Sequence, residues 1–130
     1  MASQNSYDRF FSSPSFGVVG ASNDRSKFGN KVLRKYLSSS LKAYPINPHE
    51  KNVEGIDAFA SVIDLPSETK SISIITPPAV TEKIIEEALQ KGVQNIWMQP
   101  GAESLKAIEE CKKAGINVIA DGSCILVTLK

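Results

Sequence analysis

Short apolar runs alternate with amphipathic segments along most of this chain. Between the runs, apolar residues recur at helical spacing, as they do from Phe28 to Leu37. The runs span 16–20, 41–47, 71–75, 95–98 and 116–120, and the first is continuously apolar and stops at glycine, as is typical of a buried strand. Strands that alternate with helices are joined by crossovers and lie parallel. We therefore predict an α/β fold: a doubly wound parallel sheet in a single three-layer domain.

A clear helical pattern follows the run 71–75. It begins at Thr76-Pro77-Pro78, where proline suits the first turn. Its predicted buried face comprises Val80, Ile84, Ile85, Ala88 and Leu89. The charges Glu82, Lys83, Glu86 and Glu87 are typical of its solvated face.

Other segments are less regular. Pro45 removes a hydrogen-bond donor from the second strand, which predicts an edge position or hydrogen bonding on one side only. We expect a short connection over 54–66 with one helical turn after Ser61, and a short final strand over 124–127. Residues 1–14 have no amphipathic periodicity, so we expect a flexible arm there and the domain over 15–130.

Composition excludes several classes of function. The chain has 130 residues, and its 15 basic against 14 acidic residues give a net charge of +1, which favours neither nucleic acid nor a membrane surface as partner. Two cysteines, Cys111 and Cys124, and the single His49 are too few for a disulfide framework or a zinc site, so we expect no metal. We expect a cytoplasmic protein, with a mitochondrial location left open. The sequence gives no indication of an oligomeric state.

The loops at the carboxyl ends of the predicted strands are rich in Gly, Pro, Ser, Thr and Asn; they span 20–23, 47–49, 76–78, 99–101 and 121–123. In doubly wound folds, ligands bind at this edge of the sheet. The loops hold almost no carboxylate and no acid–base pair. This composition favours a binding surface over a catalytic one, and we predict no catalytic residue.

The first of these loops suits a phosphate group. Gly20, followed by the small Ala21 and Ser22, allows backbone N–H groups near a helix start to approach an anion. The loop is neither a P-loop nor a Gly-x-Gly-x-x-Gly element, so a tight turn without a ligand is an alternative.

The end of the second strand narrows the choice of nucleotide. An NAD site has an acid there to bind the ribose, whereas this strand ends in Asn47. Arg25, Lys27 and Lys51 all come from loops on this side of the sheet and would suit a phosphorylated ribose. The pattern disfavours NAD and leaves both NADP and coenzyme A (CoA) open.

Four short stretches carry a resemblance to a known family: 19–22, then 44–48 leading to Gly55, then 97–101, and Asp121 with Cys124. From about Ser15 to its end, the chain resembles the small stand-alone CoA-binding domain proteins. Those proteins are similar to the amino-terminal CoA-binding domain of the succinyl-CoA synthetase alpha subunit.

The resemblance implies a Rossmann-like fold of strand order 3-2-1-4-5 that binds CoA along the carboxyl ends of its strands. The loop after the first strand would meet the phosphates or the nucleotide, a lysine would pair with a phosphate, and the later loops would border the adenosine and the pantetheine arm. In that order, the residues implied are Gly20, Ala21, Ser22 and Asn23; Lys27 or Lys51; Asn47 and Pro48; and Thr76 and Pro77. Gln99 and Gly101 are further candidates.

The expected function is the binding of CoA or acyl-CoA by a module without catalysis of its own, because the synthetase's phosphorylated histidine lies in a second domain. The alternatives are an NADP-dependent oxidoreductase and a ligand-free interaction domain. Cys124 suggests a thiol that forms a mixed disulfide with CoA, but a small buried hydrophobic side chain is the favoured interpretation.

Overall fold

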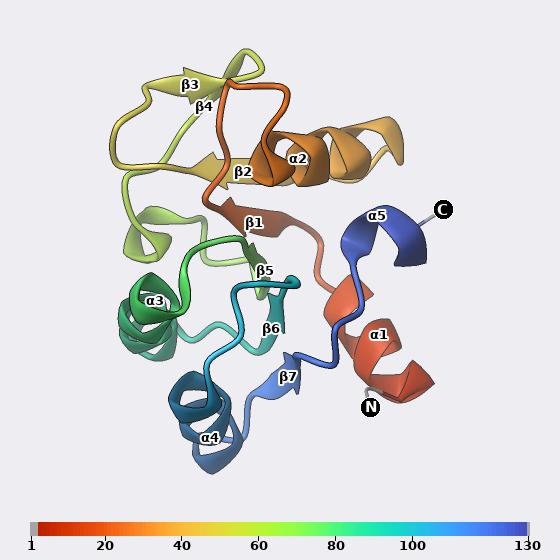
Figure 1. Cartoon of the computed structure of the whole chain (residues 1–130), viewed down its shortest axis with the longest axis vertical. Coiled ribbons are helices and arrows are strands. Elements are labelled where there is room, and N and C mark those ends of the chain that lie inside the picture. The colour runs from red at the N-terminus through yellow and green to blue at the C-terminus, as the bar shows by residue number, and fades with distance from the viewer. Residues whose placement is uncertain (1–2, 130) are drawn as a thin grey trace.

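The computed structural model describes residues 3–129 and contains a parallel sheet covered by helices on both faces (Figure 1). The strands of the sheet are β1 (Phe16–Val19), β2 (Ala43–Ile46), β5 (Ser71–Ile74), β6 (Asn95–Met98) and β7 (Asn117–Ile119). A small antiparallel hairpin consists of β3 (Asn52–Val53) and β4 (Ile56–Asp57). The helices are α1 (Gln4–Phe11), α2 (Phe28–Ser38), η1 (Val62–Asp64), α3 (Pro78–Lys91), α4 (Leu105–Lys113) and α5 (Ile125–Thr128).

The sheet separates two hydrophobic clusters, because successive strand residues point to opposite faces. On one face, Ile72, Ile74 and Ile96 pack with residues of η1, α3 and α4. On the other, Phe16 and Trp97 pack with residues of α1, α2 and α5. The predicted α/β class, with a doubly wound Rossmann-like sheet, is confirmed. Over residues 3–129, no helix has the length and apolar character needed to cross a membrane.

The strand order differs from the one implied by the resemblance. The order in the sheet is β2-β1-β5-β6-β7, so that, counted along the chain, the five strands lie 2-1-3-4-5 and the expected 3-2-1-4-5 is wrong. In the described part of the chain, the outer side of β2 forms one isolated bridge, to the segment at Phe59, whose N–H donates to the Pro45 carbonyl and whose carbonyl accepts from Asn47 N–H. Because Pro45 has no N–H, this side cannot bond a full strand. The edge position predicted for Pro45 is confirmed.

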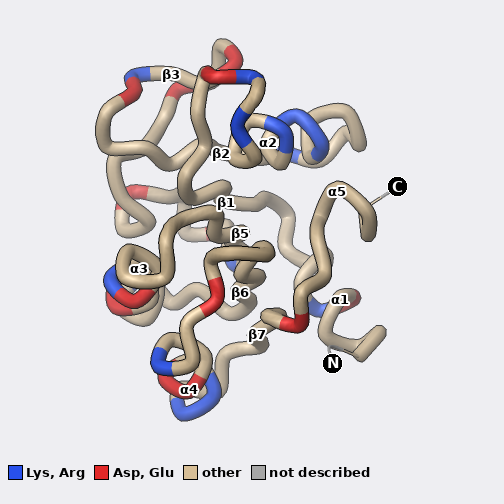
Figure 2. The backbone as a smooth tube through the Cα atoms, in the orientation of Figure 1, with Lys and Arg blue, Asp and Glu red and all other residues tan. Residues whose placement is uncertain are grey.

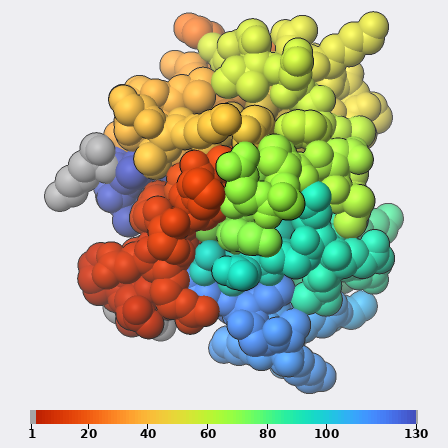
Figure 3. Space-filling model, turned by 180° about the vertical axis from the view of Figure 1, so that it is seen from behind, coloured from red at the N-terminus to blue at the C-terminus, as the bar shows by residue number. Residues whose placement is uncertain are grey.

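The flexible arm expected at the start of the chain is wrong for residues 4–11, which form α1. Ser3 caps this helix by accepting the Ser6 N–H, and Phe10 is fully buried with its ring 5.3 Å from Trp97. Tyr7, Phe10 and Phe11 recur at helical spacing, and their rings all contact Trp97. Figure 3 shows this segment, in red, packed against the body of the molecule. Residues 1–2 lie outside the described part.

The end of the chain forms a helix where a short strand was expected over 124–127. The chain turns away from the sheet at Gly122, which has φ +85°, and passes over the end of β6. There the Trp97 indole N–H donates to the Ser123 carbonyl, and Ile125 N–H donates to Gln99 Oε1. These bonds start α5, which packs on α2. The helical turn expected after Ser61 is confirmed as η1. The Ser61 hydroxyl caps this turn by accepting the Ile63 N–H.

Candidate functional site

The order of the strands reverses between β1 and β5. The chain passes from β1 to β2 on one side of β1 and then returns to form β5 on the other side, so the carboxyl ends of β1 and β5 are the topological switch point. The two ends lie in direct contact. Gly20 has φ +94°, and a Cβ atom there would lie 2.5 Å from the Ile75 carbonyl oxygen. Only glycine fits this turn, because a side chain would meet backbone atoms that cannot move aside.

A second glycine brings α2 against the same turn. A Cβ atom at Gly29 would overlap the Gly20 carbonyl oxygen. The helix therefore starts directly at the loop that follows β1, which we call the phosphate loop (residues 20–27). Lys27, at the N-cap of α2, makes no side-chain capping bond. The N–H groups of Ala21, Ser22 and Asn23 make no hydrogen bond within the described residues. The loop thus offers unpaired N–H groups beside a helix N-terminus.

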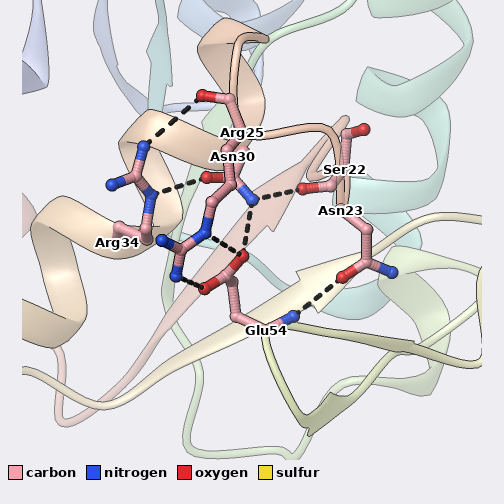
Figure 4. A network of polar contacts seen from close by, with 6 residues as sticks. All are labelled: Ser22, Asn23, Arg25, Asn30, Arg34 and Glu54. Carbon is pink, nitrogen blue, oxygen red and sulfur yellow. Dashed lines mark hydrogen bonds and ion pairs between the residues drawn. The ribbon is translucent and has the colours of Figure 1, made fainter.

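A polar network fixes this loop to the β3–β4 hairpin (Figure 4). The Glu54 carboxylate accepts from Arg25 Nη2 at 2.7 Å and from Asn30 Nδ2 at 2.9 Å. Asn30 also donates to the Ser22 carbonyl at 2.7 Å, and Glu54 N–H donates to Asn23 Oδ1 at 3.0 Å. The hydrogen bonds from Arg25 and Asn30 lower the pKa of Glu54 to about 2. The hairpin therefore carries the anion that neutralises Arg25 and holds the loop.

Three more hydrogen bonds stiffen the network. Asn30 is fully buried, and its Oδ1 accepts from Arg34 Nε at 2.6 Å. Asp24 accepts both the hydroxyl and the N–H of Ser26, which together lower the pKa of Asp24. Asp24 of the phosphate loop and Glu54 of the hairpin are thus both held as anions by donors within the chain.

Several residues predicted to bind a ligand make hydrogen bonds that hold the loops together. The Ser22 hydroxyl accepts Asp24 N–H, and all the polar side-chain atoms of Asn23 bond to the hairpin region. Asn47 Nδ2 donates to the Ala21 carbonyl at 2.8 Å, and its Oδ1 accepts His49 N–H at 2.8 Å. These side chains therefore set the shape of the phosphate loop.

A pocket of about 450 Å³ opens between the ends of β1 and β2 and helix α3. Four of the predicted residues line it: Gly20, Asn47, Pro48 and Thr76. Most of the remaining wall is apolar, with Val19, Ile46, Ala60, Val80 and Ile84. We call this the first pocket. It is suited to a flat apolar group with a few polar atoms at its rim.

A second pocket of about 270 Å³ lies beside it, across the ends of β5 and β6. Thr76 lines both pockets, so they adjoin at this residue. Predicted residues Pro77 and Gly101 line the second pocket, together with Ile75, Pro100 and Ala102. The two pockets form one path along the carboxyl edge of the sheet.

The α3 wall of the first pocket was not recognised from the sequence. Val80, expected in the core, is 40% exposed, and Ile84 is half-buried, because both line the pocket. Lys83 and Glu87 also line it. Of the predicted buried face, Ile85 and Ala88 are confirmed and Thr81 is buried with them, whereas Leu89 is 40% exposed. The apolar stripe predicted that this face of α3 is shielded from water, but it could not show which of its residues pack in the core and which line a pocket.

The solvated role expected for the charges of α3 is wrong for two of them. Glu87 accepts the Ser61 hydroxyl at 2.6 Å and Val62 N–H at 3.2 Å, and so fixes η1 against α3. Glu82 accepts the Ser104 hydroxyl at 2.6 Å at the start of α4. Both carboxylates tie neighbouring elements together.

The cations near the phosphate loop differ in their contacts. Among residues 3–129, Arg25 and Glu54 form the single ion pair, so the exposed Lys27 and Lys51 make none. Figure 2 shows further basic residues along α2. Lys31, Arg34 and Lys35 line a hollow of about 580 Å³ on the outer side of this helix, together with Arg25 and Glu54. The phosphate loop therefore lies next to a positively charged surface.

Gln99 and the cysteines lie away from the two pockets. Gln99 is fully buried; its Oε1 accepts Ile125 N–H, and its Nε2 has no partner within the described residues. Cys111 is in the core, as expected, and burial raises the pKa of its thiol to about 11. Cys124 is half-buried just before α5 and lines neither pocket.

Comparison with known proteins identifies the family to which this chain is similar. Residues 14–130 match the family described as CoA binding domain. The alpha subunit of an ADP-forming acetate–CoA ligase II from Pyrococcus furiosus is 35% identical over 92 residues, which cover 68% of this chain and 20% of that subunit. An ADP-forming acetate–CoA ligase from Methanocaldococcus jannaschii is 32% identical over 80 residues, which cover 62% of this chain and 11% of that protein. This chain thus spans a fifth or less of these two ligases.

Some solved structures match over almost their entire length. A conserved hypothetical protein from Pyrococcus furiosus has a TM-score of 0.83 at 35% identity, covering 87% of this chain and 97% of that one. A Thermus thermophilus protein has a TM-score of 0.85 at 25% identity, covering 98% and 96%. The same fold therefore occurs in chains of similar size.

Proposed function

Because this chain belongs to the CoA-binding domain family, we propose that it binds coenzyme A, free or acylated, along the carboxyl edge of its sheet. The observation that carries the proposal is the placement of two adjoining pockets beside the phosphate loop, whose N–H groups are unpaired. The pockets suit the two ends of an extended ligand, and the loop suits the charged group between them.

The first pocket takes the adenine base. Its wall is largely apolar, and Val80 and Ile84 leave a surface on α3 that lacks a packing partner in the protein. Burying a flat ring there removes apolar area from water at about 25 cal/mol per Å². Asn47 and Pro48 border this pocket, in agreement with the role expected for them at the adenosine.

The phosphate loop takes the diphosphate. Gly20 and Gly29 bring the start of α2 close to the end of β1, so that the N–H groups of residues 21–23 and the helix dipole act on the same anion. The network around Glu54 holds this arrangement in place before a ligand arrives, which reduces the entropy lost on binding.

Lys27 and Lys51 pair with the phosphate on the ribose. They are exposed and make no ion pair within the described residues, whereas Arg25 is neutralised by Glu54. We therefore assign the 3′-phosphate of CoA to the two lysines and not to Arg25. The basic surface along α2 raises the local concentration of such a multiply charged anion.

The second pocket takes the pantetheine arm, which passes Thr76, Pro77 and Gly101. Glu87, the carboxylate that lines the first pocket, already accepts hydrogen bonds from Ser61 and Val62, and no described carboxylate lines the second pocket. We therefore propose a binding module without a reaction of its own; a regulatory role and a cytoplasmic location stay predictions from the sequence.

A side-by-side titration with CoA, dephospho-CoA, NADP and NAD tests the proposal. A ligand at 100 times its dissociation constant stabilises the fold by about 2.7 kcal/mol, which a thermal shift resolves. We expect CoA to give the largest shift and dephospho-CoA a smaller one. In Lys51→Ala, the difference between these two ligands should shrink, and in the control Lys106→Ala it should not. A shift with NADP and none with CoA would support the oxidoreductase alternative. If none of the four ligands shifts the melting temperature, the turn at Gly20 binds none of these nucleotides and the proposal is wrong.

A further inference from the structure

Two charged side chains of α3, Lys83 and Glu87, line the first pocket. The helix begins at Pro78, just after the carboxyl end of β5, and returns toward the opposite edge of the sheet, where β6 starts. Its later residues therefore lie further from the phosphate loop. Lys83 and Glu87 come about one and a half and two and a half turns after Pro78, so they line the part of the pocket that is distant from this loop.

The polar residues at the near end of this pocket are bonded within the protein. Asn47 donates to the Ala21 carbonyl of the phosphate loop and accepts the N–H of His49. The Thr76 hydroxyl shares a hydrogen bond with that of Thr81. These contacts fix the end of the pocket beside the phosphate loop and use the polar side-chain atoms of Asn47 and Thr76.

Lys83 and Glu87, in contrast, keep hydrogen-bonding groups that the protein does not use. Glu87 Oε1 accepts both the Ser61 hydroxyl and the Val62 N–H, which fixes the side chain, whereas Oε2 accepts no hydrogen bond from residues 3–129. Lys83 is exposed, and within the same residues its ammonium group forms no ion pair, not even with Glu87 one helical turn away. Side chains four residues apart are neighbours on a helix. The far end of the pocket thus presents a donor beside an acceptor.

A donor beside an acceptor matches one edge of adenine. The ring nitrogen N1 accepts a hydrogen bond, and the adjacent amino group N6 donates one. Both atoms lie on the edge of the base that is furthest from the ribose. A base that enters the first pocket with its ribose toward the phosphate loop therefore brings this edge to Lys83 and Glu87.

We propose that Lys83 and Glu87 select adenine in the first pocket: the Lys83 ammonium group donates to N1, and Glu87 Oε2 accepts from N6. This assignment rests on the proposed function, because it takes the adenine of CoA as the occupant of this pocket. A 6-oxo purine carries a hydrogen on N1 and an oxygen at C6, so each protein group would face a group of its own kind. A site built to hydrogen-bond its ligand discriminates against such an analogue, because its polar groups are then left unpaired.

Calorimetric titration with CoA and with deamino-CoA tests this selection, because deamino-CoA has a 6-oxo purine but the same phosphates and the same pantetheine arm. We expect the unmodified chain to bind CoA about tenfold or more tightly than deamino-CoA. Lys83→Met removes the donor and keeps an unbranched side chain. Glu87→Gln keeps Oε1 for the contacts with η1 and replaces the second acceptor by a donor. Each variant should weaken the binding of CoA by about three- to tenfold and narrow the preference for CoA over deamino-CoA.

Lys91→Met and Glu86→Gln are the matched controls, since both residues belong to α3 but do not line the pocket, and they should leave the preference unchanged. Equal affinities of the unmodified chain for CoA and deamino-CoA overturn the selection of adenine and leave the proposed binding of CoA intact. A preference that either Lys83→Met or Glu87→Gln retains in full also overturns the assignment. If neither ligand binds the unmodified chain, the proposed function itself is wrong, and the assignment with it.

Discussion

The phosphate loop and the loops after β5 and β6 lie at the same edge of the sheet, but they are held in different ways. The phosphate loop is fixed by side chains distant in sequence, with Asn23 and Asn30 reaching the hairpin at Glu54. The turns that line the second pocket after β5 and β6 are held partly by residues close in sequence. Thr76 and Thr81 share a hydroxyl contact of 2.8 Å, and Gly101 N–H donates to Glu103 Oε1 at 2.7 Å.

This difference indicates two kinds of binding surface. Phosphate groups require donors in fixed positions, because a misplaced N–H group loses most of its interaction with an anion. A flexible pantetheine arm tolerates a wall that adjusts. Substitutions in the network of the phosphate loop should therefore affect both stability and affinity, and substitutions in the later loops should have smaller effects.

The largest effect is expected for Gly29→Ala. A Cβ atom there overlaps the Gly20 carbonyl oxygen, so α2 must move away from β1. We expect a loss of about 3 kcal/mol in unfolding free energy, the upper end of the usual cost of overpacking, together with loss of CoA binding. Urea unfolding and calorimetric titration measure the two quantities.

Gly17→Ala is the matched control for this substitution. A Cβ atom at Gly17 would contact only side-chain ends, at 3.0 Å from Ile72 and Leu65 and 3.1 Å from Ile46, and such ends can shift. We expect a loss of about 1 kcal/mol and a nearly unchanged affinity. Equal behaviour of the two variants would show that the contact between Gly29 and Gly20 has no special role in the site.

Glu54→Gln should have an intermediate effect, and one that depends on pH. The pKa of Glu54 in the folded chain is about 2, against an ordinary value of 4.5, so its contribution to stability is complete above pH 4.5 and is lost as the pH falls toward 2. The difference in melting temperature between wild type and Glu54→Gln should shrink over this range. At neutral pH, we expect the affinity for CoA to fall by roughly three- to tenfold, because the loop is less well ordered before binding.

Glu86→Gln controls for the general effect of removing a negative charge, since Glu86 is exposed on α3 and makes no hydrogen bond to another described side chain. Its melting temperature should stay parallel to that of the wild type across the same pH range. A constant difference between wild type and Glu54→Gln down to pH 2 would contradict the assignment of the lowered pKa to Glu54.

Local patterns predicted the elements and the loops that carry the site. Runs rich in apolar residues, such as 71–75 and 95–98, end within one residue of the strand ends, so the carboxyl-edge loops could be identified, including Gly20, Thr76 and Gly101. The edge position of β2 was also predicted, since Pro45 cannot donate to a neighbouring strand.

Features that depend on distant partners could not be predicted. The roles of Asn23 and Asn30 require Glu54, which follows them by 31 and 24 residues. The aromatic residues of α1 become buried only because Trp97, far along the chain, lies opposite them. For the same reason, the strand order taken from the resemblance was wrong. The bridge between the segment at Phe59 and the outer side of β2 also joins residues that are distant in sequence, so no local pattern could predict it.

Thr76→Val is expected to have the smallest effect and tests the adjustable side of the comparison. The substitution removes the hydroxyl contact with Thr81, but Thr81 keeps the Thr76 and Pro77 carbonyls as acceptors, at 3.4 and 3.3 Å. The cost in unfolding free energy should stay within about 1 kcal/mol, the typical net value of one hydrogen bond. Because both pockets meet at Thr76 and neither requires a fixed donor there, the affinity for CoA should change by less than about threefold. Thr76→Ser, which keeps the hydroxyl, should match the wild type. A loss in Thr76→Val greater than that in Glu54→Gln, restored in Thr76→Ser, would mean that the Thr76 hydroxyl itself bonds the ligand and that the loop after β5 is as specific as the phosphate loop.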